Sequence, residues 1–175
     1  LEKCRSVPEA IAALNIIPTA SPLTLTMADA SGSIAVAECL PGRVEIAHTM
    51  SGTPQNKKPS FVCATNKFHL PPMTPFNLPD IDDWNAEERY QTMFRALRER
   101  KASADSSRTE NSTDQNLDFA QNLLSGQNGF ICQYDRATGK DTVWSVIYDL
   151  KTPRIFRAEG NPSRRTYRED NRFFK

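Results

Sequence analysis

The stretch from residue 23 to residue 66 constrains the fold most, because it reads as short β-strands joined by tight turns. "DASG" at 29–32 opens with aspartate and places glycine at the left-handed position of a turn. "PG" at 41–42 makes the next turn. The strands are expected at 23–29, 33–38, 43–48 and 61–66. The sequence therefore predicts an antiparallel meander in the first half of the chain.

Three helices are predicted from their caps and from the spacing of their apolar residues. Ser6 and Glu9 have the S-x-x-E spacing of a capping box, and Ser112 and Gln115 have its glutamine form. The helices are expected over residues 6–18, 84–101 and 113–125. The polar, serine-rich run at 101–115 is expected to be a mobile loop.

Three further strands are expected at 129–135, 141–150 and 154–160. Strands and helices are segregated rather than alternating, which favours antiparallel α+β layers. The continuously apolar "TVWSVIY" at 142–148 is expected to be buried on both faces, in the middle of a sheet. One helix layer and one sheet would leave the other face of that sheet uncovered, which indicates missing sequence or a partner.

Composition narrows the class of protein. A chain of 175 residues suits a single domain over 1–175. A net charge of +1 gives no general case for nucleic acid, and no apolar run reaches the roughly 20 residues of a membrane span. The four cysteines show no C-x-x-C and there are two histidines, so no metal site and no cofactor are predicted. A reduced, cytoplasmic setting is the expectation.

The C-terminal run from residue 151 carries eight basic and three acidic residues, with phenylalanine and tyrosine between them. Such a run can be a nucleic-acid tail or solvated surface. It contains no RNA-binding module motif, and much of it reads as strand. We therefore predict solvated surface and no nucleic-acid partner.

"FVCATNKFHL" at 61–70 raises two hypotheses. Cys63 and His69 suggest a thiol enzyme, but the predicted strand surrounds Cys63 with apolar neighbours, where burial raises a thiol pKa and makes it inert. We predict a structural role for Cys63. Asn66 ends the strand on the opposite face, either as a strand-end cap or as a fixed N–H donor that suits an oxyanion hole.

Arg89 is the second candidate residue. Its position on the predicted helix is beside the apolar stripe. An arginine there commonly extends its stem along the apolar surface and keeps its charge in water. The alternative is a buried cation that lowers the pKa of a nearby anionic group.

The order of these motifs resembles the C-terminal part of an N-terminal-nucleophile hydrolase. The similarity is to choloylglycine hydrolases and to the acyl-coenzyme A:6-aminopenicillanic acid acyltransferase group. It is carried by "KCRSVPEAIAAL", "LTMADASGSIAVAECLPGRVEI", "ATNKF", "EERYQTM" and "DTVWSVIYDLKTPRIFRAEGNPS". The resemblance implies an αββα sandwich, incomplete in this chain, that cleaves linear amide C–N bonds of small-molecule N-acyl compounds by hydrolysis or acyl transfer.

The resemblance also implies site residues. In this family an autoprocessed N-terminal cysteine is the nucleophile, and its own α-amine is the base. The asparagine of "ATN" matches Asn66, an oxyanion donor, and the arginine of "RY" matches Arg89, near the nucleophile. Cys4 does not match the nucleophile, which the resemblance places in a missing N-terminal segment or a partner chain. Lys67 stands where the family often has histidine.

Two rival hypotheses remain open. The first is a non-catalytic α+β binding domain that keeps the fold and lacks the nucleophile. The second is a thiol enzyme in which cleavage after Lys3 makes Cys4 the new N-terminus. The 175 residues alone are expected to be inactive on acyl amides, and the sequence leaves open whether the protein forms a homo-oligomer.

Overall fold

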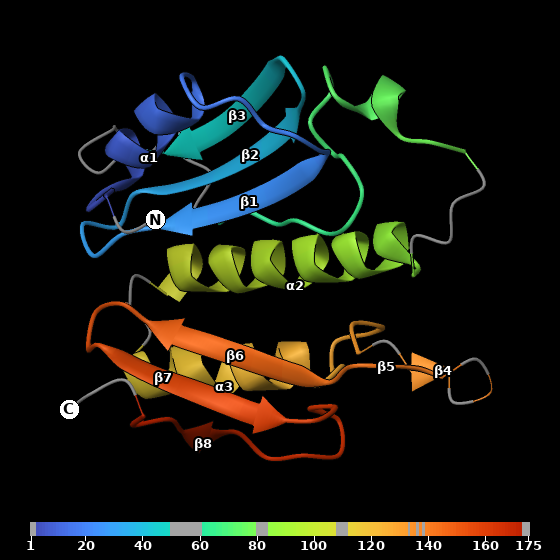
Figure 1. Ribbon diagram of the computed structural model, residues 1–175. Coiled ribbons are helices and arrows are strands. Elements are labelled where there is room, and N and C mark those ends of the chain that lie inside the picture. Colours follow the sequence, from blue (N-terminus) through green and yellow to red (C-terminus); the bar gives the residue numbers. More distant parts are fainter. Residues whose placement is uncertain are drawn as a thin grey trace. The chain divides into compact units, whose positions relative to one another are not determined.

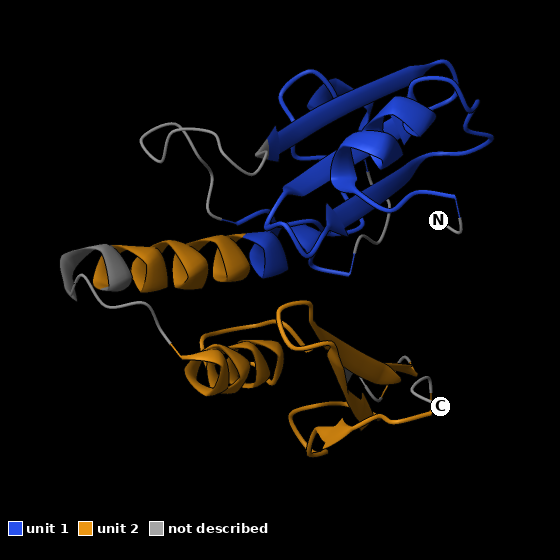
Figure 2. Cartoon of the chain, turned by 90° about the vertical axis from the view of Figure 1, so that its left-hand side faces the viewer, with its two compact units in different colours: residues 1–90 blue, residues 91–175 orange. Residues whose placement is uncertain are grey.

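The protein is described by a computed structural model that divides into two compact units, residues 1–90 and residues 91–175, coloured separately in Figure 2. Within each unit the elements are α-helices and antiparallel strands, so the class is α+β as predicted. The structure describes residues 3–49, 61–79, 84–107, 112–132, 134–135, 137 and 139–172.

The first unit contains a three-stranded antiparallel sheet in the order β1-β2-β3 (Figure 1). Gly32 and Gly42 lie in the two connecting turns with φ of +87° and +78°, a conformation that glycine adopts without steric cost. The predicted meander is therefore confirmed for these three strands. The elements are α1 Val7–Leu14, β1 Leu23–Ala28, β2 Ile34–Leu40 and β3 Arg43–Thr49.

Hydrogen bonds of the Asp29 carboxylate connect α1 to the turn between β1 and β2. Its Oδ2 accepts a hydrogen bond from the backbone N–H of Val7 at 2.9 Å, and its Oδ1 accepts from the N–H of Ser31 at 2.9 Å. The hydroxyl of Ser31 also donates to Oδ1 at 2.5 Å, and this bond, followed by the backbone bonds, holds the pKa of Asp29 below its ordinary value. Ser6 caps α1 by accepting from the N–H of Glu9 at 3.4 Å, which confirms half of the predicted capping box, while the Glu9 carboxylate accepts from the N–H of Arg5 at 2.7 Å.

The central strand β2 is buried along most of its length. Residues 35–39 are all buried, so both faces of this strand are covered. Alternation places Val36 and Glu38 on one face and Ala35 and Ala37 on the other. Glu38 is the one carboxylate on this strand, and it is only 2% exposed.

The predicted strand at 61–66 is wrong. No strand is assigned between 61 and 79, and the only regular element there is the short 3₁₀ helix η2, Thr74–Phe76. Side chains satisfy the backbone of this segment in place of a neighbouring strand. Glu38 accepts from the N–H groups of His69 and Leu70 at 2.6 and 3.0 Å.

Asn77 gives the same segment a second side-chain anchor. Its Oδ1 accepts from the N–H of Phe68 at 2.9 Å, and its Nδ2 donates to the carbonyl of Phe68 at 2.9 Å. One amide side chain thus reproduces the two hydrogen bonds of a strand pair at a single residue. The segment is therefore held to the unit without joining the sheet, and a short alternating pattern cannot distinguish these two outcomes.

The helix α2, Ala86–Ser107, begins in the first unit and continues into the second. It ends six residues later than predicted (107 against 101), because lysine and alanine in "KASAD" continue a helix readily. The second unit also contains α3, Thr113–Leu124, whose capping box between Ser112 and Gln115 is formed as predicted. Among the described residues, no helix has both the length and the apolar character that a membrane span requires.

The strands of the second unit form two antiparallel sheets, one of β4 and β5 and one in the order β6-β7-β8. α3 packs against β6, and Phe156 and Ala158 of β7 are buried. The predicted strand at 129–135 is reduced to its last two residues. The elements are β4 Tyr134–Asp135, β5 Lys140–Asp141, β6 Trp144–Asp149, β7 Arg154–Glu159 and β8 Arg168–Glu169.

The expectation that "TVWSVIY" lies in mid-sheet, buried on both faces, is wrong. β7 is the middle strand, and β6 lies at the edge. Trp144 and Tyr148 are 53% and 66% exposed, so within the described chain β6 is covered on one face only. Apolar composition could not show this, because β-branched and aromatic side chains favour strands with one covered face as well as fully buried ones.

We predict that Glu38→Gln lowers the free energy of unfolding by about 1–3 kcal/mol. The two oxygens of Glu38 each accept one backbone N–H, whereas glutamine would turn an N–H₂ group towards one of these donors. Urea denaturation measures the loss. Glu99→Gln is the matched control, because the Glu99 side chain is exposed, so this change should alter stability by about 0–1 kcal/mol. Equal losses in the two variants would contradict the role of Glu38.

Candidate functional site

The structure brings together the two residues that the sequence singled out. The Nη2 of Arg89 donates a hydrogen bond to the Oδ1 of Asn66, and the Nε of Arg89 donates to the carbonyl of Trp84 at 2.9 Å. Asn66 is exposed and Arg89 is half-buried. Both residues lie in the first unit, 23 positions apart in the chain. Their catalytic roles stay predictions, but their proximity is part of the fold.

An uncommon backbone conformation precedes α2 at this site. Trp84 and Asn85 have φ of +58° and +54°, in the left-handed region that non-glycine residues seldom occupy. A bulky side chain such as that of Trp84 makes this costly, and such residues cluster at functional sites. The consequence here is geometric: the carbonyl of Trp84 accepts a bond from Arg89, so the turn helps to fix the guanidinium.

The bond from Arg89 also decides the orientation of the Asn66 amide. A guanidinium has only donors, so the atom of Asn66 that it meets must be the oxygen. The N–H₂ end of the amide then points away from Arg89. Asn66 therefore presents a donor group on the side opposite to the arginine.

Asn66 lies on the wall of a cavity of about 670 Å³. A cavity of this size is in the range of small-molecule sites. Its polar residues include Asn66 and Lys67. Two of its apolar residues, Phe76 and Leu78, are 45% and 71% exposed. The apolar side chains that line it are those of Pro22, Leu23, Phe68, Phe76, Leu78 and Pro79. The arrangement is a mostly apolar chamber with an amide donor and one ammonium group.

His69 belongs to the support of this site. Its Nε2 lies 2.8 Å from the Oγ1 of Thr65, and its ring stacks on that of Tyr90 at 3.6 Å between centroids. Its Nδ1 is 3.9 Å from a carboxylate oxygen of Glu87. The imidazole thus joins the irregular segment to the first turns of α2, the same two elements that carry Asn66 and Arg89. Sequence reasoning missed this stack of His69 on Tyr90.

Glu38 and Asn77 were also missed. A signal was available for Glu38, because a glutamate in the middle of an apolar strand is seldom buried without partners. For Asn77 the sequence carries no comparable signal, since asparagine is ordinary in an irregular segment.

Cys63 does not have the properties of an activated thiol. Burial raises its pKa to about 11, so at neutral pH the thiol is protonated. The thiol-enzyme hypothesis for Cys63 and His69 therefore loses its chemical basis. Within the described part of the chain, no group of three His, Cys, Asp or Glu residues is arranged to hold a metal ion.

We predict that Cys63 reacts slowly with iodoacetamide in the folded protein at pH 7.5, because the thiolate is the reactive form. Peptide mapping by mass spectrometry after timed labelling measures the rate at this one residue. The same chain unfolded in urea is the control, and there Cys63 should react much faster. Equal rates in the folded and unfolded states would show that Cys63 is an activated thiol.

The chain was also compared with known proteins. A model of the family described as acyl-coenzyme A:6-aminopenicillanic acid acyl-transferase matches residues 1–164. No curated protein matched the chain, and no solved structure matched it either. The family match includes both Asn66 and Arg89 and ends just after β7. The chain therefore belongs to the acyl-coenzyme A:6-aminopenicillanic acid acyl-transferase family, which is part of the N-terminal-nucleophile hydrolase superfamily.

Proposed function

We propose that this chain is part of an enzyme that cleaves linear amide C–N bonds of N-acyl compounds, by hydrolysis or by transfer of the acyl group to another amine. Family membership supports acyl transfer or hydrolysis at acyl amides. The observation that carries the proposal to particular residues is the Asn66–Arg89 pair beside an apolar cavity. The proposed chemistry uses a covalent acyl-enzyme and needs no cofactor.

Asn66 would act as the oxyanion donor. Attack on an amide carbonyl turns the carbonyl oxygen into an oxyanion, and a fixed N–H donor stabilises that charge. The Oδ1 of Asn66 is held by Arg89, so the N–H₂ end is oriented before substrate arrives. An amide that is already oriented costs no reorganisation during the reaction, which is the property that makes such donors effective.

The nucleophile would be the thiolate of an N-terminal cysteine outside these 175 residues, on another segment or on a partner chain. It attacks the carbonyl carbon, the C–N bond breaks, and the departing amine takes a proton from the cysteine's own α-ammonium group. Water or a second amine then attacks the thioester and releases the thiolate. Asn66 would serve the oxyanion in both steps.

The cavity beside Asn66 would hold the acyl group. Its apolar side chains suit an alkyl or aryl chain, and its volume of about 670 Å³ has room for a group of that kind. Lys67 on the same wall suits a substrate with a carboxylate near the amide. The substrate proposed is therefore a small N-acyl compound with an apolar acyl group.

For the complete protein we propose the αββα sandwich of this superfamily, with residues 1–175 as the C-terminal part of a single domain. Both units supply a three-stranded antiparallel sheet together with helix, which supports that proposal. All four cysteines are free, which supports a reduced, cytoplasmic setting.

In the enzyme that contains this chain, we predict that Asn66→Ala lowers kcat by about 10² to 10³ with little change in KM. Stability should change little, because the Asn66 side chain is exposed. Asn77→Ala is the matched control: its amide anchors the Phe68 backbone, so it should lower Tm more than Asn66→Ala does. Steady-state kinetics and thermal melting separate the two. A normal kcat in Asn66→Ala would leave the strand-end cap or a non-catalytic binding domain as the role of this site.

We also predict that Arg89→Lys lowers kcat by about tenfold or more while the protein stays folded. An ammonium group on a flexible stem cannot reproduce the planar fork that meets both Asn66 and the carbonyl of Trp84. If Arg89 acts through Asn66, then Arg89→Lys should have much less effect in the Asn66→Ala background. Additive losses in this double-mutant cycle would show that the two residues act independently.

A further inference from the structure

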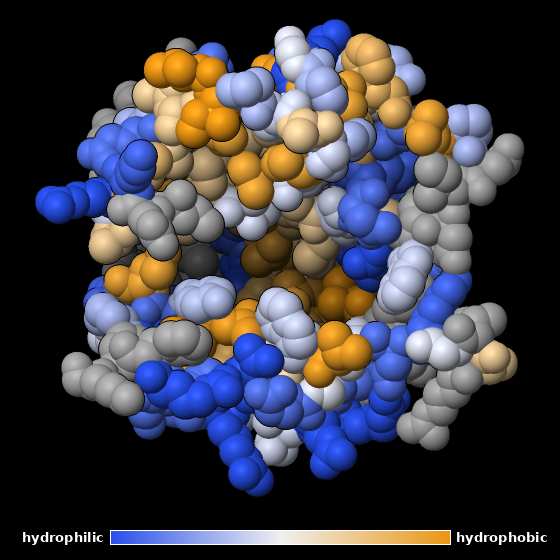
Figure 3. All heavy atoms as spheres, in the orientation of Figure 1, coloured by the Kyte–Doolittle hydropathy of each residue, from blue (hydrophilic) through white to orange (hydrophobic). Residues whose placement is uncertain are grey.

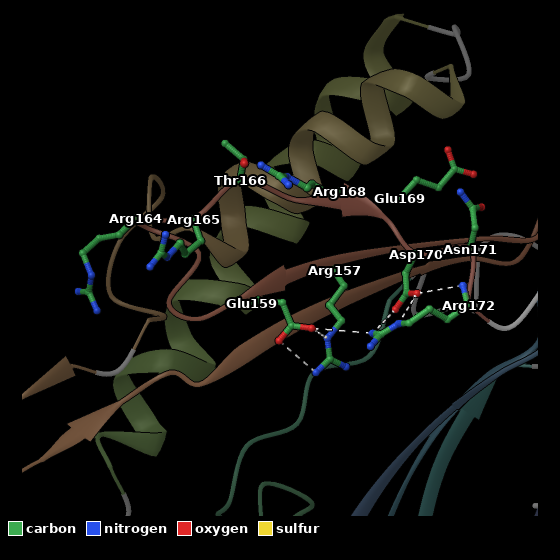
Figure 4. A pocket seen from close by; sticks show the side chains of 10 residues that line it. All are labelled: Arg157, Glu159, Arg164, Arg165, Thr166, Arg168, Glu169, Asp170, Asn171 and Arg172. Atoms are coloured by element: carbon green, nitrogen blue, oxygen red, sulfur yellow. Dashed lines mark hydrogen bonds and ion pairs between the residues drawn. The ribbon is translucent and has the colours of Figure 1, made fainter.

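A second concave site lies in the second unit, on β7, β8 and the chain between them. It is a groove of about 900 Å³, and Figure 4 shows its side chains with Arg157 and Glu159 near the centre of the labelled set. In the view of Figure 3, hydrophilic side chains gather over β7 and β8. The lining contains three carboxylates, those of Glu159, Glu169 and Asp170. It also contains five arginines: Arg157, Arg164, Arg165, Arg168 and Arg172.

Two of the carboxylates act as fixed supports for arginines. The Nη2 and Nε of Arg172 donate to the two oxygens of Asp170 at 2.6 and 2.8 Å, and this fork lowers the pKa of Asp170 to about 2. The Nε of Arg157 donates to Glu159 at 2.6 Å. These pairs place both guanidinium groups in set positions. They reduce the positive charge of the groove without removing it.

Of the three remaining arginines, Arg164 is paired with Asp141, which lies outside the groove lining, whereas Arg168 meets a like charge. The register of β7 and β8 sets Arg157 directly opposite Arg168, although like charges opposite one another destabilise a sheet. Arg165 and Arg168 form no ion pair with any residue in the described ranges. A Cβ on Gly160 would come within 3.2 Å of the Arg165 Cγ, so the stem of Arg165 lies close against this glycine.

We propose that this groove binds the phosphate groups of a small molecule, with a diphosphate as the simplest ligand. Guanidinium forks match phosphate oxygens in pairs, and a multiply charged anion relieves the repulsion between neighbouring arginines. The volume of about 900 Å³ is that of a small-molecule site. This binding is independent of the amide chemistry proposed for the first unit.

Nucleic acid is the competing class of ligand, and the groove fits it less well. Single-stranded nucleic acid is held by aromatic side chains on which successive bases stack, and among the residues that the structure describes, none that lines this groove is aromatic. The chain as a whole has a net charge of +1, so it lacks the broad positive field of nucleic-acid-binding domains. A compact diphosphate needs neither property.

The test is isothermal titration calorimetry of the unmodified chain with inorganic pyrophosphate and with ADP, at constant ionic strength and without metal ions. We expect saturable binding of both. Tighter binding of ADP would identify a nucleotide as the source of the diphosphate, and equal binding would identify the free anion. The fluorescence of Trp144 shows whether the ligand binds in this groove, because the guanidinium of Arg157 lies 5.2 Å from the centre of the Trp144 ring. Its fluorescence should follow the same titration in a Trp84→Phe variant.

The variants are Arg165→Ala/Arg168→Ala and the charge-matched control Arg98→Ala/Lys151→Ala, which lies outside the groove lining. The first should weaken pyrophosphate binding about tenfold or more, and the control should leave it within about twofold. Circular dichroism confirms that each variant is folded. Absence of saturable binding to the unmodified chain, equal weakening in both variants, or tighter binding of a short oligonucleotide than of pyrophosphate and ADP would each overturn the proposal.

Discussion

The carboxylate of Glu38 is the interaction on which the first unit's candidate site depends. It lies in the buried central strand and accepts the two N–H groups of His69 and Leu70. Burial raises its pKa, while the two N–H bonds act in the opposite direction and are the smaller influence. A buried carboxylate is costly without such partners. The irregular segment therefore supplies what Glu38 requires, and Glu38 fixes the segment that carries Asn66.

A chain of contacts leads from this anchor to the Asn66 amide. His69 is fixed at its backbone by Glu38, and its ring meets Thr65 on one side and Tyr90 on another. Tyr90 follows Arg89 in α2, so the stack sets how close the helix lies to the segment. The Arg89–Asn66 bond is formed on this support. A site built in this way has its donor oriented by packing rather than by the substrate.

The two units differ in how their charged side chains are paired. In the first, a single buried carboxylate is satisfied by backbone donors, and the adjoining cavity is mostly apolar. In the second, arginines are gathered in a groove and only partly matched by acids. The C-terminal run was predicted to be solvated surface, and two of its arginines, Arg157 and Arg168, lie directly opposite each other on paired strands. The first arrangement suits an uncharged acyl amide, and the second suits a multiply charged anion.

The sequence by itself determined the features that rest on neighbours in the chain. The turns at Gly32 and Gly42 and the capping box of Ser112 and Gln115 form between residues a few positions apart, so their patterns are readable. The family, and with it the interest in Asn66 and Arg89, also followed from the order of motifs.

Only the tertiary structure decided what long-range partners would do. Residues 61–66 have the alternation of a strand, yet the segment from 61 to 79 is held by Glu38, more than 30 positions away, and by Asn77 instead. Likewise, "TVWSVIY" has the composition of a buried strand, but β7 rather than β6 pairs on both sides. A residue's own chemistry sets which bonds it can make. The folded chain sets which partner is within reach, and for Asn66 that partner is a guanidinium 23 residues away.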